Sequence, residues 1–433
     1  MDQFLGNPQN NPTLTLNVVH YLAAGQMSEV IHSKSLNTGV TVKKIIFVFS
    51  ILLLMACCLG GCSNSSGSNL SPVAEYEGGA LFKAGPVNVL RLYGTHYQMG
   101  RQYGMLLKNE LNALYDLATA KFNSVGYTNL RMQQIANAYY ANFPQKYRDV
   151  IAGMAETSGL GLEKQILVNG IEIIPKINSI VPHCTGLVAW GDYTGGAPLI
   201  FGRNNDDHPF FRNFGGYTVI AVFNPTDGGI PTAIVNYAGV IYAPTGLNRY
   251  GIFMEINSGN SPGGFRVDRT PTVVSMFEAL QSCSTQAQVN DAFQNIAVDI
   301  SSIINVADPS SAYSFECSLS AIKRRSADQE GLLVSTNHFI DPSWGLTPPE
   351  PDSANGWTVA RRNNGIAWAE SGKGHLRVEQ VRDILSKEIT SEGGLFSEST
   401  IYQVVAVPQQ LTLWLRAPDH FDWQEIDLME LFN

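Results

Sequence analysis

The stretch His183-Cys184-Thr185-Gly186-Leu187-Val188-Ala189-Trp190 decides the fold of this chain, because it is an apolar run headed by a thiol. Such a run predicts a β-strand. A second predicted strand ends in Gly202-Arg203-Asn204-Asn205-Asp206. A thiol at the head of one strand, with Arg and Asp closing the next, can be activated without histidine. If the chain is cut before Cys184, the freed α-amine, with a pKa of about 8, can serve as general base, and Arg203 favours the thiolate.

Cys-Thr followed by Gly-Arg-Asn-x-Asp resembles the N-terminal-nucleophile (Ntn) cysteine hydrolases, among them choloylglycine hydrolase and acid ceramidase. The self-cleaving penicillin (isopenicillin N) acyltransferase family is the most similar in overall layout, from about residue 87 to near the C-terminus. The resemblance implies autocleavage of the His183–Cys184 bond and acyl transfer onto the Cys184 thiol. It also implies that Asp206 orients the freed α-amine and that Arg203 lies against the thiolate. Arg203 favours the hydrolases, since the acyltransferases proper often carry a neutral residue there.

Three further positions match the family more loosely. Asn337, in Thr336-Asn337-His338-Phe339, is similar to the Thr-Asn element that supplies an oxyanion donor. Asn257 is a candidate second oxyanion or substrate contact, although Arg249 replaces the usual Glu of the preceding turn. Arg361 falls where the family often has Ser-x-x-Arg, and the adjacent Arg362 leaves the choice between the two arginines open.

Each of these residues also has a plain structural interpretation. Cys184 can be a buried structural cysteine, Arg203 and Asp206 a surface salt bridge, and Asn337 a turn cap. His183, His208 and His338 suggest a Cys–His protease instead. Papain-like enzymes, however, begin a helix at the cysteine within Cys-Gly-Ser-Cys-Trp, and this cysteine opens a strand-like run.

Bulk composition narrows the class of protein. Of 433 residues 44% are hydrophobic and 15% charged, and the net charge is −9. That balance is ordinary for a globular protein. A nucleic-acid partner is not expected, because no basic cluster exceeds Lys323-Arg324-Arg325. No cofactor and no metal are expected either, because a phosphate loop, CxxC and HxxxH are all missing from the sequence.

Residues 1–62 are predicted to be an upstream extension followed by a lipoprotein signal peptide. Lys43-Lys44 precede the apolar run Ile45 to Leu59, which is short for a membrane span of about 20 residues. Leu59-Gly60-Gly61-Cys62 resembles a bacterial lipobox, which implies lipidation of Cys62 and export to the bacterial cell envelope. Residues 63–75 are predicted to be a flexible tether. An uncleaved N-terminal anchor is the alternative.

Two cysteines are left once Cys57 and Cys58 are assigned to the signal, Cys62 to lipid and Cys184 to catalysis. Cys283 and Cys317 are compatible with one disulfide in an exported protein, or with two separate buried thiols.

The pattern along the chain predicts a helical segment over 76–183 and a catalytic domain over 184–433. A short strand is expected at Val87 to Leu92, and the glycines of Gly94 to Gly104 are interpreted as turn residues. After Cys184, strands separated by Gly, Pro, Asn and Asp turns alternate with helices. Two antiparallel sheets with helices outside are an α+β, four-layer αββα sandwich.

The predicted function is that of an exported, self-processing cysteine amidohydrolase acting on a non-peptide amide of a small N-acyl substrate. An acyltransferase using the same acyl-enzyme and a catalytically silent lipid-binding lipoprotein are the alternatives. Aromatic side chains are candidates for an acyl pocket, or for plain core: Trp190, Phe210, Phe211, Tyr237 and Tyr242.

Overall fold

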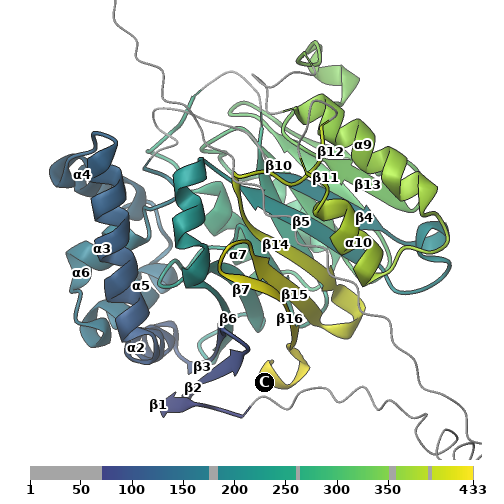
Figure 1. Ribbon diagram of the computed structural model, residues 1–433. Coiled ribbons are helices and arrows are strands. Elements are labelled where there is room, and N and C mark those ends of the chain that lie inside the picture. The colour runs from purple at the N-terminus through teal and green to yellow at the C-terminus, as the bar shows by residue number, and fades with distance from the viewer. Residues whose placement is uncertain (1–70, 175–183, 260–263, 351–356, 389–392, 433) are drawn as a thin grey trace, which may run out of the picture. The chain divides into compact units, whose positions relative to one another are not determined.

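The computed structural model describes residues 71–174, 184–259, 264–350, 357–388 and 393–432 (Figure 1). His183, Cys62 and the predicted signal peptide therefore lie outside the described residues. The strands form two sheets, and the predicted α+β class with two packed sheets is confirmed.

The larger sheet has ten strands in the spatial order β1-β2-β3-β6-β7-β8-β9-β10-β11-β12. Their bounds are β1 Ala74–Tyr76, β2 Gly79–Ala84, β3 Val87–Gly94, β6 Thr218–Pro225, β7 Thr232–Tyr237, β8 Thr245–Asn248, β9 Phe253–Ser258, β10 Ser302–Ala307, β11 Ala312–Cys317 and β12 Ile322–Arg325. The pairing of β3 with β6 is parallel, whereas the sequence predicts antiparallel sheets throughout. The chain can make this parallel pair because the helices between β3 and β6 provide a long crossover connection.

The smaller sheet has six strands in the order β13-β4-β5-β14-β15-β16. Their bounds are β13 Leu332–Ser335, β4 Thr185–Ala189, β5 Ile200–Asp206, β14 Thr400–Val407, β15 Thr412–Ala417 and β16 Phe421–Asp427. Strands β4 and β5 are adjacent and antiparallel, so the two stretches that resemble the Ntn family lie side by side.

The two sheets pack face to face across the main hydrophobic core. The rings of Phe201 on β5 and Phe253 on β9 have centroids 4.4 Å apart, which joins one sheet to the other. Helices α9 (Thr358–Ser371) and α10 (Val378–Leu385) cover the outer face of the six-stranded sheet (Figure 1). Helices α2 (His96–Leu106) and α7 (Thr272–Ser282) cover the ten-stranded sheet, which completes the four layers.

The segment before Cys184 contains α2 and four more helices, which lie together on one side of the sheets in Figure 1. These are α3 (Lys108–Ser124), α4 (Asn129–Tyr140), α5 (Gln145–Ser158) and α6 (Leu162–Val168). The segment also supplies β1, β2 and β3, although the sequence pattern predicts little strand there.

Helices α2 and α5 approach each other more closely than side chains usually allow. Thr95 caps α2 in a capping box with Gln98, so the helix begins at His96 and Gly100 lies inside it. A Cβ at Gly100 would overlap the carbonyl of Val150, and one at Gly153 would overlap the carbonyl of Tyr97. Gly100 therefore serves helix–helix contact, and its interpretation as a turn residue is wrong.

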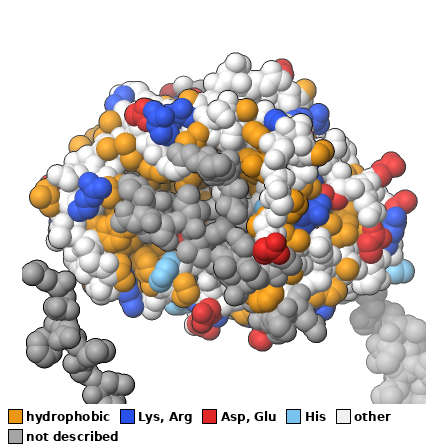
Figure 2. All heavy atoms as spheres, turned by 90° about the horizontal axis from the view of Figure 1, so that it is seen from above, with side chains coloured by type: hydrophobic (Ala, Val, Ile, Leu, Met, Phe, Trp, Pro, Cys, Tyr) orange, Lys and Arg blue, Asp and Glu red, His pale blue; other side chains and the backbone are white. Residues whose placement is uncertain are grey.

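The surface carries scattered hydrophobic side chains. Figure 2 shows them over much of one face, with charged side chains mostly towards its edge. Single exposed apolar residues of this kind are normal for a folded protein. In the part of the chain that the structure describes, no helix is both long and apolar enough to cross a membrane.

Candidate active site

Cys184 lies at the head of β4, directly before Thr185. Its thiol is buried and donates a hydrogen bond to the backbone carbonyl of Asp206, with Sγ 3.3 Å from the oxygen. The position follows from the strand register, because Thr185 pairs with Asn204 on β5. The head of β4 and the end of β5 thus meet at one edge of the six-stranded sheet.

Arg203 and Asp206 both line the pocket into which Cys184 opens. Three residues apart on a regular strand, their side chains would face opposite sides. A bend at Asn204-Asn205 would bring both inward, but β5 stays in register with β4 and continues to Asp206. The irregularity lies in β14, where the pairing with β5 shifts between Thr400 and Tyr402. A β-bulge of this kind re-aims side chains, here at the end of the neighbouring strand.

Glu255 on β9 is the buried counter-charge of Arg203, and sequence reasoning missed it. Arg203 forms an ion pair with its carboxylate and donates to the carbonyl of Ile256 at 2.8 Å. Glu255 also accepts from the amide of Asn257 at 3.3 Å and from that of Asn305. Glu255 and Asn257 alternate along β9, so they lie on the same face of the strand. The sequence signal that could have identified Glu255 is the pair of polar residues two positions apart in an otherwise apolar strand.

Arg361 connects Cys184 to Asn337. Its guanidinium donates to the Cys184 carbonyl at 2.9 Å, to the Thr185 hydroxyl at 2.7 Å and to the Asn337 side-chain carbonyl at 2.6 Å. Arg362 instead points away from Cys184 and donates to Asp328 at 2.5 Å. Successive helical residues face different directions, so the choice that the sequence left open falls on Arg361.

These contacts fix which way the two asparagine amides point. Because a guanidinium only donates, the carbonyl of Asn337 must face Arg361, and its Nδ2 donates to the Ser258 carbonyl at 2.9 Å. In Asn257 the Nδ2 faces Glu255 and the Ser335 hydroxyl, and its Oδ1, at the pocket wall, has no hydrogen-bond partner among the residues that the structure describes. The geometry thus makes Asn257 a hydrogen-bond acceptor towards the pocket.

Burial dominates the electrostatics of the site. It raises the pKa of the Cys184 thiol to about 11, against the opposing charge of Arg203. It also raises the pKa of Asp206 to about 7, opposed by Arg361, by the nearby Thr400 hydroxyl and by Arg203. Among the described residues, neither Asp206 oxygen makes a hydrogen bond of good geometry. Burial lowers the pKa of Arg361 to about 10. In the uncut chain the thiol is therefore protonated at neutral pH.

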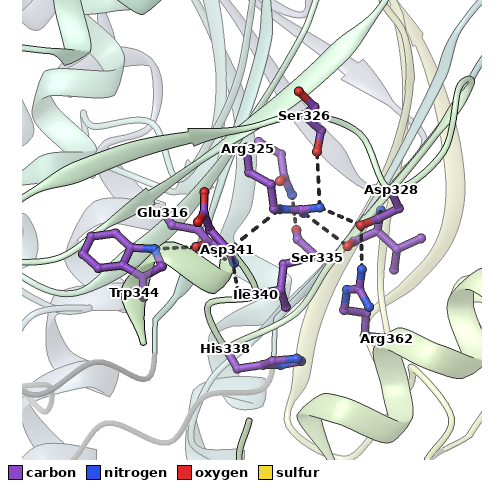
Figure 3. Close-up of polar contacts among 12 residues, drawn as sticks. Glu316, Arg325, Ser326, Asp328, Ser335, His338, Ile340, Asp341, Trp344 and Arg362 are labelled. Carbon is purple, nitrogen blue, oxygen red and sulfur yellow. Dashed lines mark hydrogen bonds and ion pairs between the residues drawn. The ribbon is translucent and has the colours of Figure 1, made fainter. Parts of the chain in front are cut away.

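A second polar network holds the loop that carries Asn337 (Figure 3). Asp328 accepts from Arg325 at 2.7 Å, from Arg362, and from the backbone of Val334 at 2.6 Å. Glu316 accepts from the backbone of Ile340 at 2.8 Å. Charged anchors on both sides of residues 335–340 thus fix the end of β13.

The histidines do not support a Cys–His protease. Nδ1 of His338 lies 2.9 Å from the Thr358 hydroxyl, and its pKa is lowered to about 4 by burial and then by Arg362. His208 is exposed, and His183 lies outside the described residues. Among the described residues that line the Cys184 pocket there is no histidine.

The other cysteines and most of the candidate aromatic residues lie away from the Cys184 pocket. Cys283 and Cys317 are separate buried thiols. Of the five candidate aromatic residues, Tyr242 lines the pocket, and the others pack in or against the main core. Within the described ranges, no three His, Cys, Asp or Glu side chains are grouped to hold a metal ion.

Comparisons with known proteins return amidases and acyltransferases. No family model matches the chain. It is 24% identical over 275 residues to the 40 kDa form of acyl-coenzyme A:6-aminopenicillanic-acid acyltransferase of Emericella nidulans, covering 60% of this chain and 72% of that protein. The predicted resemblance to the penicillin acyltransferase family is thereby confirmed.

Other matches are shorter or more distant. Protein dcd1A of Dictyostelium discoideum is 34% identical over 92 residues, which is 20% of this chain and 19% of that protein. Protein dcd1B of the same organism matches over 40% of its length. The chain thus spans less than half of either Dictyostelium relative. A solved structure, the Caenorhabditis elegans ortholog of N-acylethanolamine-hydrolyzing acid amidase, is 19% identical, with a TM-score of 0.41 over 57% of this chain and 100% of that one.

Proposed function

We propose that the chain is a self-processing cysteine amidohydrolase that cleaves a non-peptide C–N amide bond of an N-acyl substrate. The observation that carries the proposal is that the Cys184 thiol and the buried Asp206 carboxylate line one pocket, while Arg361 joins the Cys184 carbonyl to Asn337. A buried carboxylate is costly, so its place beside Cys184 needs an explanation. Asp206 is the natural partner for the Cys184 α-amine once the chain is cut.

The catalytic cycle follows from these positions. Loss of a proton to the freed α-amine makes the thiolate, which attacks the amide carbonyl and forms a tetrahedral intermediate. One N–H of Asn337 donates to the Ser258 carbonyl, and we assign the second to the oxyanion. The protonated α-amine, held by Asp206, returns its proton to the leaving amine. Water then attacks the thioester and releases the acid.

Acyl transfer is the second candidate, because an amine can replace water in the last step. The Emericella relative is named as an acyltransferase, and this supports acyl transfer as the second candidate. Trapping the acyl-enzyme and then comparing release by water with release by added amines separates the two activities.

The deciding experiment is intact mass spectrometry of the purified chain and its Cys184→Ala variant. Self-processing requires a C-terminal fragment that begins at Cys184 in the parent and an uncut 183–184 bond in the variant. An uncut bond in both proteins would end the proposal and would favour a silent binding protein. Alkylation is a second check, since a silent relative has no fast, pH-dependent reaction at Cys184.

Export and lipid anchoring at Cys62 form part of the proposal and rest on the lipobox-like sequence. Metabolic labelling with a fatty acid tests them, because Cys62→Ala should lose the label while the catalytic site stays intact.

A further inference from the structure

The loop between β7 and β8 supplies part of the wall of the Cys184 pocket. It spans residues 238–244, and its members Tyr242 and Pro244 line the pocket. Every residue of the loop is buried, although the loop has no regular secondary structure. Its backbone N–H and C=O groups therefore need partners other than those that a sheet or helix provides.

Side chains from the helices that precede β4 provide several of these partners. Asn169, directly after α6, donates from Nδ2 to the Gly239 carbonyl at 2.9 Å and accepts at Oδ1 from the Ile241 N–H at 3.1 Å. Gln165 donates to the same carbonyl at 3.2 Å. The N–H of Gly239 donates to the Tyr103 hydroxyl at 3.0 Å. The helical segment thus holds the tip of the loop by its backbone.

The tip of the loop also fits closely against these helices. Gly239 has a φ of +81°, and an added Cβ would lie 2.0 Å from Cδ2 of Leu111 on α3 and 3.3 Å from Cγ1 of Val168 on α6. The first distance leaves no room for a side chain, and the backbone conformation favours glycine as well. The loop therefore cannot move towards the helices, and the hydrogen bonds oppose its movement away from them.

Asn169 is chemically suited to this contact. A side-chain amide presents a donor and an acceptor side by side, so it can pair with the carbonyl and the N–H of one backbone segment. Its Nδ2 also donates to the Gln165 carbonyl at 3.0 Å, which fixes the amide on the last turn of α6. Asn169 is only 3% exposed, so water cannot readily replace its hydrogen bonds.

The loop adjoins other apolar residues of the pocket wall. The N–H of Ile256 on β9 donates to the Pro244 carbonyl at 3.1 Å, and the N–H of Ala243 donates to the Val273 carbonyl at 3.4 Å. Ile256 and Val273 line the pocket, as Tyr242 does. A displaced loop would therefore alter an apolar part of the wall, which is the kind of surface that an acyl chain contacts.

We propose that Asn169 is a positioning residue for recognition of the substrate's acyl group. By holding residues 239–241 it fixes the Tyr242 and Pro244 wall, and so sets which acyl chains fit beside Cys184. Asn236 on β7 holds the other end of the loop, since its Nδ2 donates to the Tyr242 carbonyl at 3.1 Å. The inference rests on the proposed acyl-enzyme, because the acyl group bonded to Sγ shares the pocket with this wall.

The first test measures kcat/KM for fluorogenic amides of straight-chain acids from acetyl to decanoyl. In the parent, kcat/KM should vary by about thirtyfold or more along the series, and in Asn169→Ala the range should shrink to about fivefold or less. The acetyl amide should change by less than about threefold, because the reacting groups stay in place. A parent without chain-length dependence, or a variant lowered equally at every length, would overturn the proposal.

The matched control is Asn248→Ala. Asn248 is likewise buried, and it donates to the Leu280 carbonyl at 2.9 Å and accepts from the Ile252 N–H at 3.1 Å. None of these three residues occurs among the described residues that line the pocket. The control should lose stability as Asn169→Ala does and keep the parent's chain-length profile. An equally flattened profile would mean that lost stability changes the selectivity, and would refute the assignment.

A milder variant covers the case in which Asn169→Ala does not fold. Gln165→Met removes one hydrogen bond to the Gly239 carbonyl at nearly equal side-chain volume. It should narrow the range of kcat/KM in the same direction and to a smaller extent. A folded Gln165→Met protein with the full range of the parent would count against the role of the loop.

The last test needs no turnover. Iodoacetamide and its N-hexyl derivative both alkylate the Cys184 thiolate, since a C–S bond forms and iodide leaves. The hexyl-to-unsubstituted ratio of labelling rates, divided by the same ratio for free cysteine, should fall by about threefold or more in Asn169→Ala and stay constant in Asn248→Ala. An unchanged ratio in a protein that hydrolyses amides would refute the role of Asn169 alone. A lowered ratio without hydrolysis of any amide would count against the amidase alone.

Discussion

Asp206 is the residue whose state changes most if the chain cuts itself. In the uncut chain its carboxyl is buried, and this burial raises its pKa to about 7. A pKa raised by folding means that the protonated form is favoured in the native state. The associated stability is fully present below the ordinary pKa of about 4 and is lost as the pH rises through about 7.

This reasoning predicts the stability of the uncut Cys184→Ala protein. Its free energy of unfolding should fall by up to about 4 kcal/mol between about pH 4 and about pH 7, since three pKa units are worth roughly that much. Adding Asp206→Asn should remove this fall, because the amide does not titrate. Urea denaturation at a series of pH values measures both, and parallel profiles for the two proteins would contradict the assignment.

Substitution of Glu255 should change thiol reactivity and turnover in opposite directions. Its charge raises the pKa of the Cys184 thiol, whereas that of Arg203 lowers it. In Glu255→Gln the thiol pKa should fall, and alkylation of Cys184 at neutral pH should speed up by about threefold or more.

Turnover by the same variant should drop by about tenfold, because the one acceptor oxygen of Gln cannot serve both Arg203 and the amide of Asn257, as the two oxygens of Glu255 do. Stability should fall by about 3 kcal/mol, since Arg203 is left buried without its counter-charge. Alkylation profiles, amide hydrolysis and urea denaturation measure the three effects. Alkylation and turnover that fall together would show that Glu255 has only a structural role.

At the scale of elements, β4 depends on a glycine that the Cys-Thr-Gly motif supplies. A Cβ at Gly186 would overlap both the Glu255 carboxylate and the Asn305 amide on the facing sheet. Gly186→Ala should therefore separate β4 from β9 and β10 locally. We expect a loss of about 1–3 kcal/mol in stability and a turnover defect similar to that of Glu255→Gln.

The control for Gly186→Ala is Gly365→Ala on α9, where the added Cβ would lie 3.2 Å from one methyl group of Val334 and would overlap no backbone atom. Thermal unfolding of both variants measures the difference. Equal and small shifts in Tm would show that the sheet tolerates the extra methyl group and that the close approach is not required.

The sequence predicts those elements whose pattern is local. The sequence predicts strands β4 and β5 close to where they lie, since apolar runs and turn residues mark them. Strand β16 was not expected, because it is an edge strand whose side chains are mostly partly or fully exposed. Its sequence lacks the apolar alternation of a half-buried strand.

In the candidate site, too, the sequence identifies only the residues that a local motif marks. Motifs identify all six candidate site residues. Four of them line one pocket in the structure, namely Cys184, Arg203, Asp206 and Asn257, and Arg361 joins the Cys184 carbonyl to Asn337. Glu255 could not be placed from sequence, because its role depends on the packing of β9 against β5 and on its register opposite Asn305. The choice between Arg361 and Arg362 likewise needed the orientation of α9.

At the scale of the whole molecule, the proposed cut would leave two pieces that share one core. The piece before Cys184 supplies β1, β2 and β3, and β3 pairs with β6 of the other piece over seven residue pairs. Its helices also contribute buried side chains to the main core, Tyr103 and Tyr147 among them. Separation would expose this apolar surface and break the β3–β6 ladder, so the pieces should stay together.

We therefore expect the cut protein to migrate as one particle in native size-exclusion chromatography and to split into two bands only under denaturing conditions. A protease site engineered just before residue 184 in Cys184→Ala tests this even if no self-cleavage occurs. As a control, Leu90→Asp on β3 places a charge in the shared core and should let the cut pieces separate. Separation of the unmodified pieces in native buffer would instead mean that the first segment is a removable propiece, and the active form would lack three strands of its larger sheet.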